Sequence, residues 1–161
     1  STGDYSTRIS NRKILSGLIQ AVKLEDTTIL SDIELVVFRA IDKLDRLGLE
    51  GVKNLLSKGR IDSSGDFTEG ANLSADQIDT IISFLQITNS DPYKTLEEMK
   101  YFIGDSEIGR QGQSELSYIT DTLLSKDISN LSFKIDPSVV RGLASIQEQF
   151  LKLSYLLQPD C

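Results

Sequence analysis

Few residues of this chain could carry chemistry, because two of the commonest catalytic side chains are absent or nearly so. The 161-residue sequence contains no histidine and one cysteine, Cys161. Serine–histidine and cysteine–histidine catalysis are therefore excluded, as are a zinc site built on imidazole or several thiolates and an iron–sulfur cluster. Any chemistry must rest on carboxylates, Arg, Lys, Tyr or hydroxyl groups, and we predict no metal site.

Acidic side chains are plentiful, but their spacing does not indicate a catalytic pair. Glu97 and Glu98 are adjacent, so on a helix they point to different faces. The segment 62–73 is rich in oxygen ligands, but a calcium-binding EF-hand loop needs Gly at its sixth position and Glu at its twelfth. Phe67 and Leu73 stand there. We therefore interpret this segment as a solvent-exposed connector.

Basic residues form two small clusters in an acidic chain. The sequence has 17 Lys and Arg against 24 Asp and Glu, and its net charge of −7 repels a polyphosphate at long range. Such clusters are usually solvated surface, and the alternative is a patch that contacts phosphates. The two clusters are Arg8, Arg12 and Lys13, and Lys53, Lys58 and Arg60.

The elements that must position these residues are mostly helical. Apolar residues recur every three or four positions along most of the chain, which is the period of an amphipathic helix. The stripes run through residues 15–22, 33–47, 52–56, 78–85, 96–103, 116–123 and 139–157.

Helix boundaries are marked by capping residues. Ser31 with Glu34, and the segment 74–77, have the serine-to-acid or amide spacing of a capping box. The pair at 91–92, Asp followed by Pro, favours another helix start. Gly48 stands where the second helix would end. Polar loops are predicted at residues 60–72 and 104–112.

Two short segments are predicted to be extended. Residues 5–9 and 131–135 alternate in polarity and are rich in strand-forming side chains. Because two strands alone are marginally stable in water, we expect them to belong to a sheet with further strands elsewhere. The prediction is a mainly α fold, in which two short β-strands flank a helical region.

The last apolar stripe, residues 139–157, follows Asp136 and Pro137, which would cap a helix. It packs either on the protein's own core, as short stripes more commonly do, or on a second chain, in which case it would mediate self-association. No apolar run reaches the roughly 18 residues of a membrane span, and residues 1–12 lack the apolar core of a secretory signal. We therefore expect a cytoplasmic protein without a membrane partner.

Three segments resemble the middle of the bacterial histidyl-tRNA synthetases that carry a helical insertion. Residues 3–15, GDYSTRISNRKIL, are similar to the strand and helix that follow class II motif 2. Residues 39–52, with IDKLDRLG followed by GV, resemble the insertion. Residues 135–143, IDPSVVRGL, are similar to the second histidine motif. The three segments occur in the order that the family has.

This resemblance implies a domain plan and a function. Residues 1–13 would be an edge strand and lead-in, 14–130 the helical insertion domain, and 131–161 a strand-like stretch with a C-terminal amphipathic helix. The full enzyme joins histidine to its tRNA with ATP and magnesium, and its insertion domain contacts the acceptor arm of the tRNA. The implied partners are therefore histidine tRNA and the remainder of the synthetase.

The resemblance also assigns one residue of the active site. Arg141 matches the arginine that lies against the histidine carboxylate and the ATP α-phosphate, where a fixed guanidinium stabilises negative charge. The family continues with an acidic residue and two tyrosines, whereas residues 144–148 read ASIQE. Class II motifs 1, 2 and 3 and the anticodon-binding domain are missing too. We therefore expect no cofactor in this chain and no aminoacylation by this chain alone.

Lys53, Lys58 and Arg60 are the predicted phosphate contacts if the chain binds tRNA. Two other functions stay open. A catalytically inactive protein-interaction module or synthetase paralogue would use the 139–157 stripe as its docking surface. The regulatory subunit of ATP phosphoribosyltransferase is a synthetase-like relative, but it usually lacks the helical insertion.

Overall fold

The computed structural model describes residues 6–22, 30–125 and 132–140. Within these ranges the chain is mainly helical, and a short strand lies on either side of the helical region, so the predicted fold class is confirmed. The helices are α1 (Arg12–Ala21), α2 (Leu30–Asp42), α3 (Leu44–Leu56), α4 (Ala75–Leu85), α5 (Pro92–Ile103) and α6 (Glu107–Ser125). The strands are β1 (Ser6–Ile9), β2 (Gly59–Ile61), β3 (Phe67–Glu69) and β4 (Ser132–Ile135).

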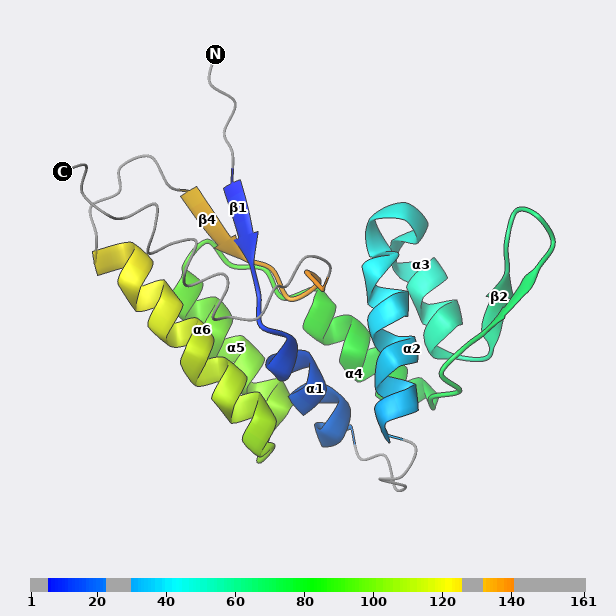
Figure 1. Ribbon diagram of the computed structural model, residues 1–161, viewed down its shortest axis with the longest axis horizontal. Coiled ribbons are helices and arrows are strands. Elements are labelled where there is room, and N and C mark those ends of the chain that lie inside the picture. Colours follow the sequence, from blue (N-terminus) through cyan, green and yellow to red (C-terminus); the bar gives the residue numbers. More distant parts are fainter. Residues whose placement is uncertain (1–5, 23–29, 126–131, 141–161) are drawn as a thin grey trace, which may run out of the picture.

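The two flanking strands pair with each other. β1 and β4 are parallel, in a register that runs from Ser6 opposite Ser132 to Ile9 opposite Ile135. Parallel neighbours need a crossover connection, and here the whole helical region supplies it (Figure 1). Ile135 is almost fully buried, so the inner end of the pair joins the hydrophobic core.

Helices α1, α5 and α6 pack together beside this strand pair (Figure 1). Three glycines permit the contact between α1 and α6, because a Cβ atom on Gly17 would lie under 3.0 Å from the backbone of Gly109, and one on Gly112 under 3.0 Å from that of Ile14. The loop predicted at residues 104–112 is therefore wrong beyond Ser106, since α6 begins at Glu107. Gly109 and Gly112 mark a close helix contact, while Gly104, with a φ of 53°, ends α5 in the turn that the sequence predicts.

Helices α2 and α3 correct the prediction of one helix through residues 33–47. The helix ends at Asp42 and a new one starts at Leu44, and Gly48 interrupts α3 with a left-handed φ of 67°. The break at Gly48 is where the sequence predicts it, because glycine adopts this backbone conformation without a Cβ clash. The capping box at Ser31 stays a prediction, because the side chain of Ser31 lies outside the described residues, and Glu34 accepts a hydrogen bond from Ser16 of α1.

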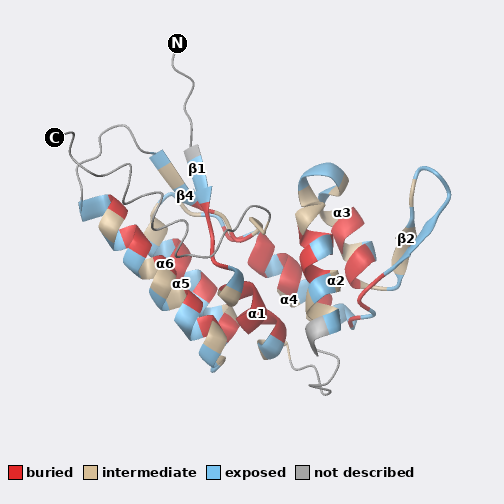
Figure 2. Ribbon diagram, in the orientation of Figure 1, coloured by how far each residue is buried: buried red, intermediate tan, exposed pale blue. Residues whose placement is uncertain are grey.

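The other two helix starts are confirmed. Ser74 and Gln77 form the reciprocal capping box at the start of α4, with Ser74 N donating to Gln77 Oε1 at 2.9 Å. Asp91 caps α5 by accepting from the backbone N of Tyr93 at 2.9 Å, and Pro92 is its first residue. The apolar faces of these helices point into one continuous core (Figure 2).

Residues 59–69 form a hairpin, whereas the sequence predicts an irregular loop over residues 60–72. β2 and β3 are antiparallel, with Arg60 opposite Thr68 and Ile61 opposite Phe67. Each strand has three residues, too few to show an alternating pattern in the sequence. The hairpin projects from the end of α3, away from the helices that pack beside the strand pair (Figure 1).

The segment after β4 is a turn. Asp136 Oδ1 accepts from the backbone N of Ser138 at 3.0 Å, and Val139 N donates to Asp136 O at 3.2 Å. A helix starting at Asp136 and Pro137 is therefore wrong as far as Val140, where the described residues end. The rest of the predicted helix, the remainder of the 139–157 stripe and Arg141 lie outside the described residues.

Candidate nucleic-acid interface

The three predicted phosphate contacts lie along one stretch that leads into the hairpin. Lys53 is in the last turn of α3, and Lys58 follows Ser57, the C-cap residue of this helix. Arg60 is the middle residue of β2. Lys53 Nζ lies 3.2 Å from Glu50 Oε1, so part of its charge is already matched. Within the described part of the chain, Lys58 and Arg60 form no ion pair.

Backbone hydrogen bonds fix the base of the hairpin to α3. Gly70 N donates to Lys58 O at 3.0 Å, and the backbone N atoms of the next three residues donate to carbonyl groups at the end of α3, at 2.7 to 3.0 Å. Ala71 and Leu73 are buried. A Cβ atom on Gly70 would lie under 3.0 Å from the carbonyl oxygens of Ser57 and Leu55. The hairpin is therefore held at a fixed angle to the helix.

The tip of the hairpin is closed by one carboxylate. Asp62 Oδ1 accepts hydrogen bonds from the backbone N atoms of Ser64 and Asp66, both at 2.9 Å, and from Ser64 Oγ at 2.7 Å. The bond from the Ser64 side chain, followed by that from the Asp66 backbone, lowers the pKa of Asp62. This carboxylate thus serves to order the turn.

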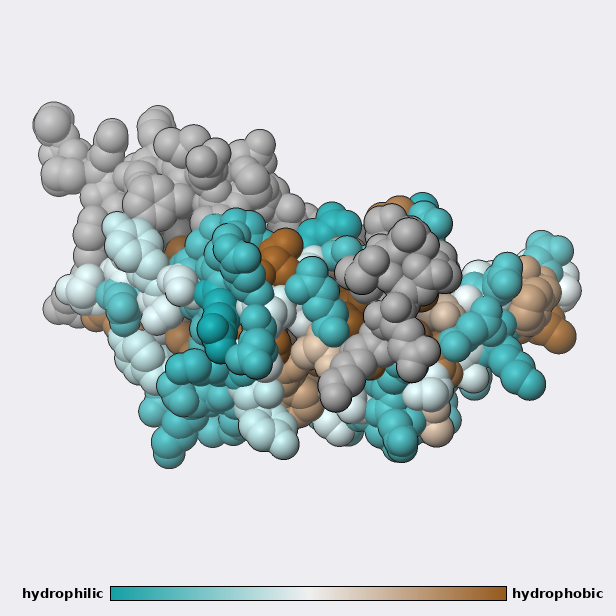
Figure 3. Space-filling view, turned by 90° about the horizontal axis from the view of Figure 1, so that it is seen from below, coloured by the Kyte–Doolittle hydropathy of each residue, from teal (hydrophilic) through white to brown (hydrophobic). Residues whose placement is uncertain are grey.

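The two faces of the hairpin differ in chemistry. Side chains of a strand alternate between faces, so Ile61 and its partner Phe67 share one face, while Arg60 and Thr68 share the other. Ile61 is 66% exposed and Phe67 is 63% exposed. Most of the surface in Figure 3 is hydrophilic, but apolar atoms stand out at the hairpin end. This apolar pair was not predicted from the sequence, because the strands themselves were not.

A separate cleft of ≈ 440 Å³ lies where the strand pair meets the junction of α2 and α3. Arg8 of β1 lines it and also pairs with Asp136, at 3.4 Å between Nη1 and Oδ2. Lys43, Arg46 and Val140 are further lining residues. Arg141 follows Val140 directly in the sequence. The structure therefore brings residues 138–140, which belong to the segment 135–143 that resembles the second histidine motif, to this cleft. Arg141 itself lies beyond the described residues.

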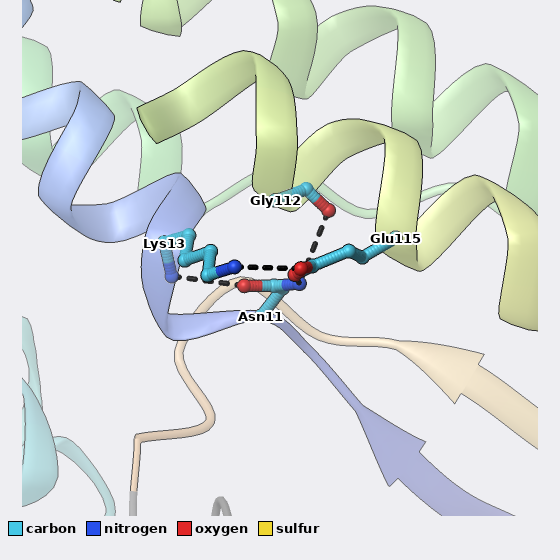
Figure 4. A network of polar contacts seen from close by, with 4 residues as sticks. All are labelled: Asn11, Lys13, Gly112 and Glu115. Atoms are coloured by element: carbon cyan, nitrogen blue, oxygen red, sulfur yellow. Dashed lines mark hydrogen bonds and ion pairs between the residues drawn. The ribbon is translucent and has the colours of Figure 1, made fainter. Parts of the chain in front are cut away.

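A polar network joins the start of α1 to α6 (Figure 4). Asn11 Nδ2 donates to Gly112 O at 3.1 Å and to Glu115 Oε2 at 2.9 Å, and Lys13 Nζ lies 2.6 Å from Glu115 Oε1. Burial raises the pKa of Glu115, but the hydrogen bonds from Lys13 and Asn11 and the charge of Lys13 outweigh it, so the pKa is lowered. The network thus holds the start of α1 against α6.

Two kinds of site are not found in the described ranges. There, no group of three or more Asp, Glu, Cys or His side chains is arranged to hold a metal ion. None of the described helices is long and apolar enough to cross a membrane.

Comparison with known proteins identifies the relatives of the chain. No family model matches it. Histidine–tRNA ligase of Dinoroseobacter shibae is 45% identical over 144 residues, which are 88% of this chain and 29% of that protein. The enzyme of Bartonella henselae is 45% identical over 140 residues, or 87% of this chain and 28% of that protein.

One solved structure has the same fold. The crystal structure of histidyl-tRNA synthetase from Nostoc sp. PCC 7120 matches with a TM-score of 0.68 and 26% identity, over 88% of this chain and 29% of that one. The chain thus spans less than a third of the length of the relatives it matches. It is homologous, in sequence and in fold, to a segment of the histidine–tRNA ligases.

Proposed function

We propose that this chain acts as part of a histidine–tRNA ligase and that residues 14–130 are its insertion domain, which contacts the acceptor arm of histidine tRNA. The remainder of the enzyme would supply the sites for ATP and magnesium, and the protein would work in the cytoplasm. Support comes from the relatives, which carry the name histidine–tRNA ligase at 45% identity. Their shared segment contains the whole hairpin.

The projecting hairpin carries the proposal of tRNA contact. Lys58 and Arg60 stand at its base without an ion pair among the described residues, and the hydrogen bonds to α3 fix the backbone that carries them. Because the chain as a whole has a net charge of −7, an RNA is repelled at long range and needs such a local site. Lys53 adds a third cation, weakened by its pairing with Glu50.

The hairpin also carries acidic groups that limit this contact. Asp62 is used in the turn, while Asp66 and Glu69 are exposed near the tip and at the end of β3. Glu69 is opposite Gly59 and therefore also lies at the base, on the face away from Arg60. Phosphates should therefore approach Lys58 and Arg60 from the Arg60 face of the hairpin, and avoid the tip and the Glu69 face. This placement makes the contact a small one, with a shallow dependence on salt.

The catalytic part of the proposal concerns Arg141. It would lie against the histidine carboxylate and the ATP α-phosphate, where a fixed guanidinium stabilises the charge that develops as the adenylate forms. The cleft that Val140 lines, between the strand pair and the junction of α2 and α3, supports this placement, because substrate sites are commonly such hollows between structural units. Aminoacylation needs the other segments of the enzyme, so this chain alone should be inactive.

Binding of tRNA tests the proposal. Fluorescence anisotropy with labelled histidine tRNA and a non-cognate tRNA, at about 50 and about 150 mM salt, should show tighter, salt-dependent binding to the cognate tRNA. Lys58→Glu and Arg60→Glu should each weaken binding and flatten the plot of log affinity against log salt, by about one unit of slope for each lost contact.

Lys94→Glu is the matched control. Lys94 is exposed on α5, on a different element from the hairpin, and has the same charge as Lys58. It should leave the slope unchanged except for a small long-range effect. If all three variants weaken binding equally, only the net charge matters and the hairpin is not the contact. If the unsubstituted chain binds neither tRNA at low salt, the proposed function itself is wrong.

A further inference from the structure

The apolar face of the hairpin presents an aromatic ring at a fixed position. Phe67 lies directly across from Ile61, and both side chains are mostly exposed. The next residue along β2 on the same face is Gly59, and a Cβ atom there would lie within 3.0 Å of Phe67 Cζ. The ring therefore reaches over the glycine, across both strands of the hairpin, and is not folded back into a core.

The charges around this ring favour a base over a phosphate. Glu69 shares the face of Phe67, while Arg60 is on the opposite face. A phosphate would be repelled from the Phe67 face and attracted to the Arg60 face. The ribbon is only two strands wide, so a nucleic-acid strand that passes its edge can place a base on one face and direct its phosphate toward the other.

We propose that Phe67 is a stacking platform for an unpaired base at the single-stranded end of the RNA that the hairpin contacts. This inference rests on the proposed function, because it names which part of the RNA the hairpin meets. Aromatic side chains hold unpaired bases by stacking, whereas the bases of a duplex are already stacked on one another. An exposed aromatic ring lies on the same hairpin as Arg60 and next to Lys58, two cations that form no ion pair among the described residues, and this combination suits single-stranded nucleic acid.

Fluorescence offers a direct test, since the chain contains no tryptophan. In Phe67→Trp, the new indole is the only one in the full chain and keeps an aromatic face. Its emission should be quenched by an acceptor-stem minihelix of histidine tRNA that ends in unpaired 3′ nucleotides. A minihelix with the same duplex and a blunt end should leave the emission nearly unchanged.

Affinity measurements separate stacking from charge. Phe67→Leu keeps an apolar side chain but removes the π face, and it should lose about tenfold in affinity for the minihelix with the unpaired end. The slope of log affinity against log salt should stay the same, because no charge is removed. Ile61→Ala, on the same face, is the control and should change affinity less than Phe67→Leu does. Circular dichroism checks that each variant is folded.

Three outcomes are decisive. If the minihelices bind but the indole emission of Phe67→Trp does not change, the stacking inference is wrong and the proposed function stands. If neither minihelix nor tRNA binds, the proposed function fails first. If the indole emission changes with protein concentration in the absence of RNA, the apolar face is a protein interface, which also overturns the inference.

Discussion

Asn11 and Glu115 are 104 residues apart in the sequence and are joined by a hydrogen bond of 2.9 Å from Nδ2 to Oε2. The same Asn11 side chain caps α1, because its Oδ1 accepts from the backbone N of Lys13 at 2.9 Å. One residue therefore starts the first helix and attaches it to α6 (Figure 4). Since Asn11 lies just after β1, this bond also sets how the strand pair joins the helices.

Replacing Asn11 by Ala should lower the free energy of unfolding by about 2 to 3 kcal/mol. Loss of the cap accounts for about 1 kcal/mol, and the loss of the donors to Gly112 O and Glu115 accounts for the rest. Urea denaturation followed by circular dichroism measures this change. Asn54→Ala, at an exposed position of α3, is the control and should stay within about 0.5 kcal/mol of the unsubstituted chain. If both substitutions lower the free energy of unfolding equally, the hydrogen bonds of Asn11 do not contribute to stability.

The pKa of Glu115 predicts how stability depends on pH. Because the folded state lowers this pKa below its ordinary 4.5, the carboxylate stabilises the fold when it is charged, at pH values above 4.5. That contribution is lost as the pH falls through the lower folded pKa. Between about pH 6 and pH 3, the unsubstituted chain should therefore lose more unfolding free energy than Glu115→Gln does. Parallel pH profiles in urea denaturation would contradict this prediction.

The parts of the fold that the sequence predicts are those set by near neighbours. Ser74 and Gln77 cap α4 through atoms three residues apart, and Asp91 caps α5 two residues away. The strands β1 and β4 also show their alternation within a few residues. Such local chemistry acts the same way wherever the segment lies in the fold.

Glycines illustrate what the sequence does not predict. Gly48 interrupts a helix, whereas Gly109 and Gly112 lie inside one, and nothing in their immediate neighbours separates the two cases. The difference comes from α1, which approaches α6 so closely that only glycine fits. The residues of the hairpin site also fall into those that the sequence predicts and those that it does not. The charges of Lys58 and Arg60 are visible in the sequence, but the exposed pair on the hairpin follows from strand pairing alone.

Substitution of Gly17 tests this close contact. In an isolated helix, Ala is favoured over Gly by about 1 kcal/mol, so a merely helical role would make Gly17→Ala stabilising. Here the new Cβ would lie under 3.0 Å from the Gly109 backbone. The helices must separate, and we expect a loss of about 1 to 3 kcal/mol in urea denaturation. Gln111→Ala, exposed on α6, is the control, and a stabilised Gly17→Ala would refute the contact.

Substitution of Gly70 should loosen the hairpin while the helices stay intact. A Cβ atom there would lie under 3.0 Å from the carbonyl oxygens of Ser57 and Leu55, so the hydrogen bonds at the base of the hairpin must lengthen. Hydrogen exchange should become about tenfold faster or more at the backbone N–H of Ala71, for a local loss of about 1 to 3 kcal/mol.

Amide exchange in α4, measured at Ile78, should change much less, because that helix has its own cap and buries its own apolar face. Thr68→Ala, at an exposed position on β3, is the control for any change in the hairpin sequence. If Gly70→Ala speeds exchange equally at both sites, the hairpin and the helices unfold as one unit. If exchange is unchanged at Ala71, the hairpin does not depend on the close contact at Gly70. The expected result is that Gly70→Ala makes amide exchange faster at Ala71 and leaves it slow at Ile78. Only this result would show that the contact at Gly70 holds the hairpin in place and that the helices are stable without it.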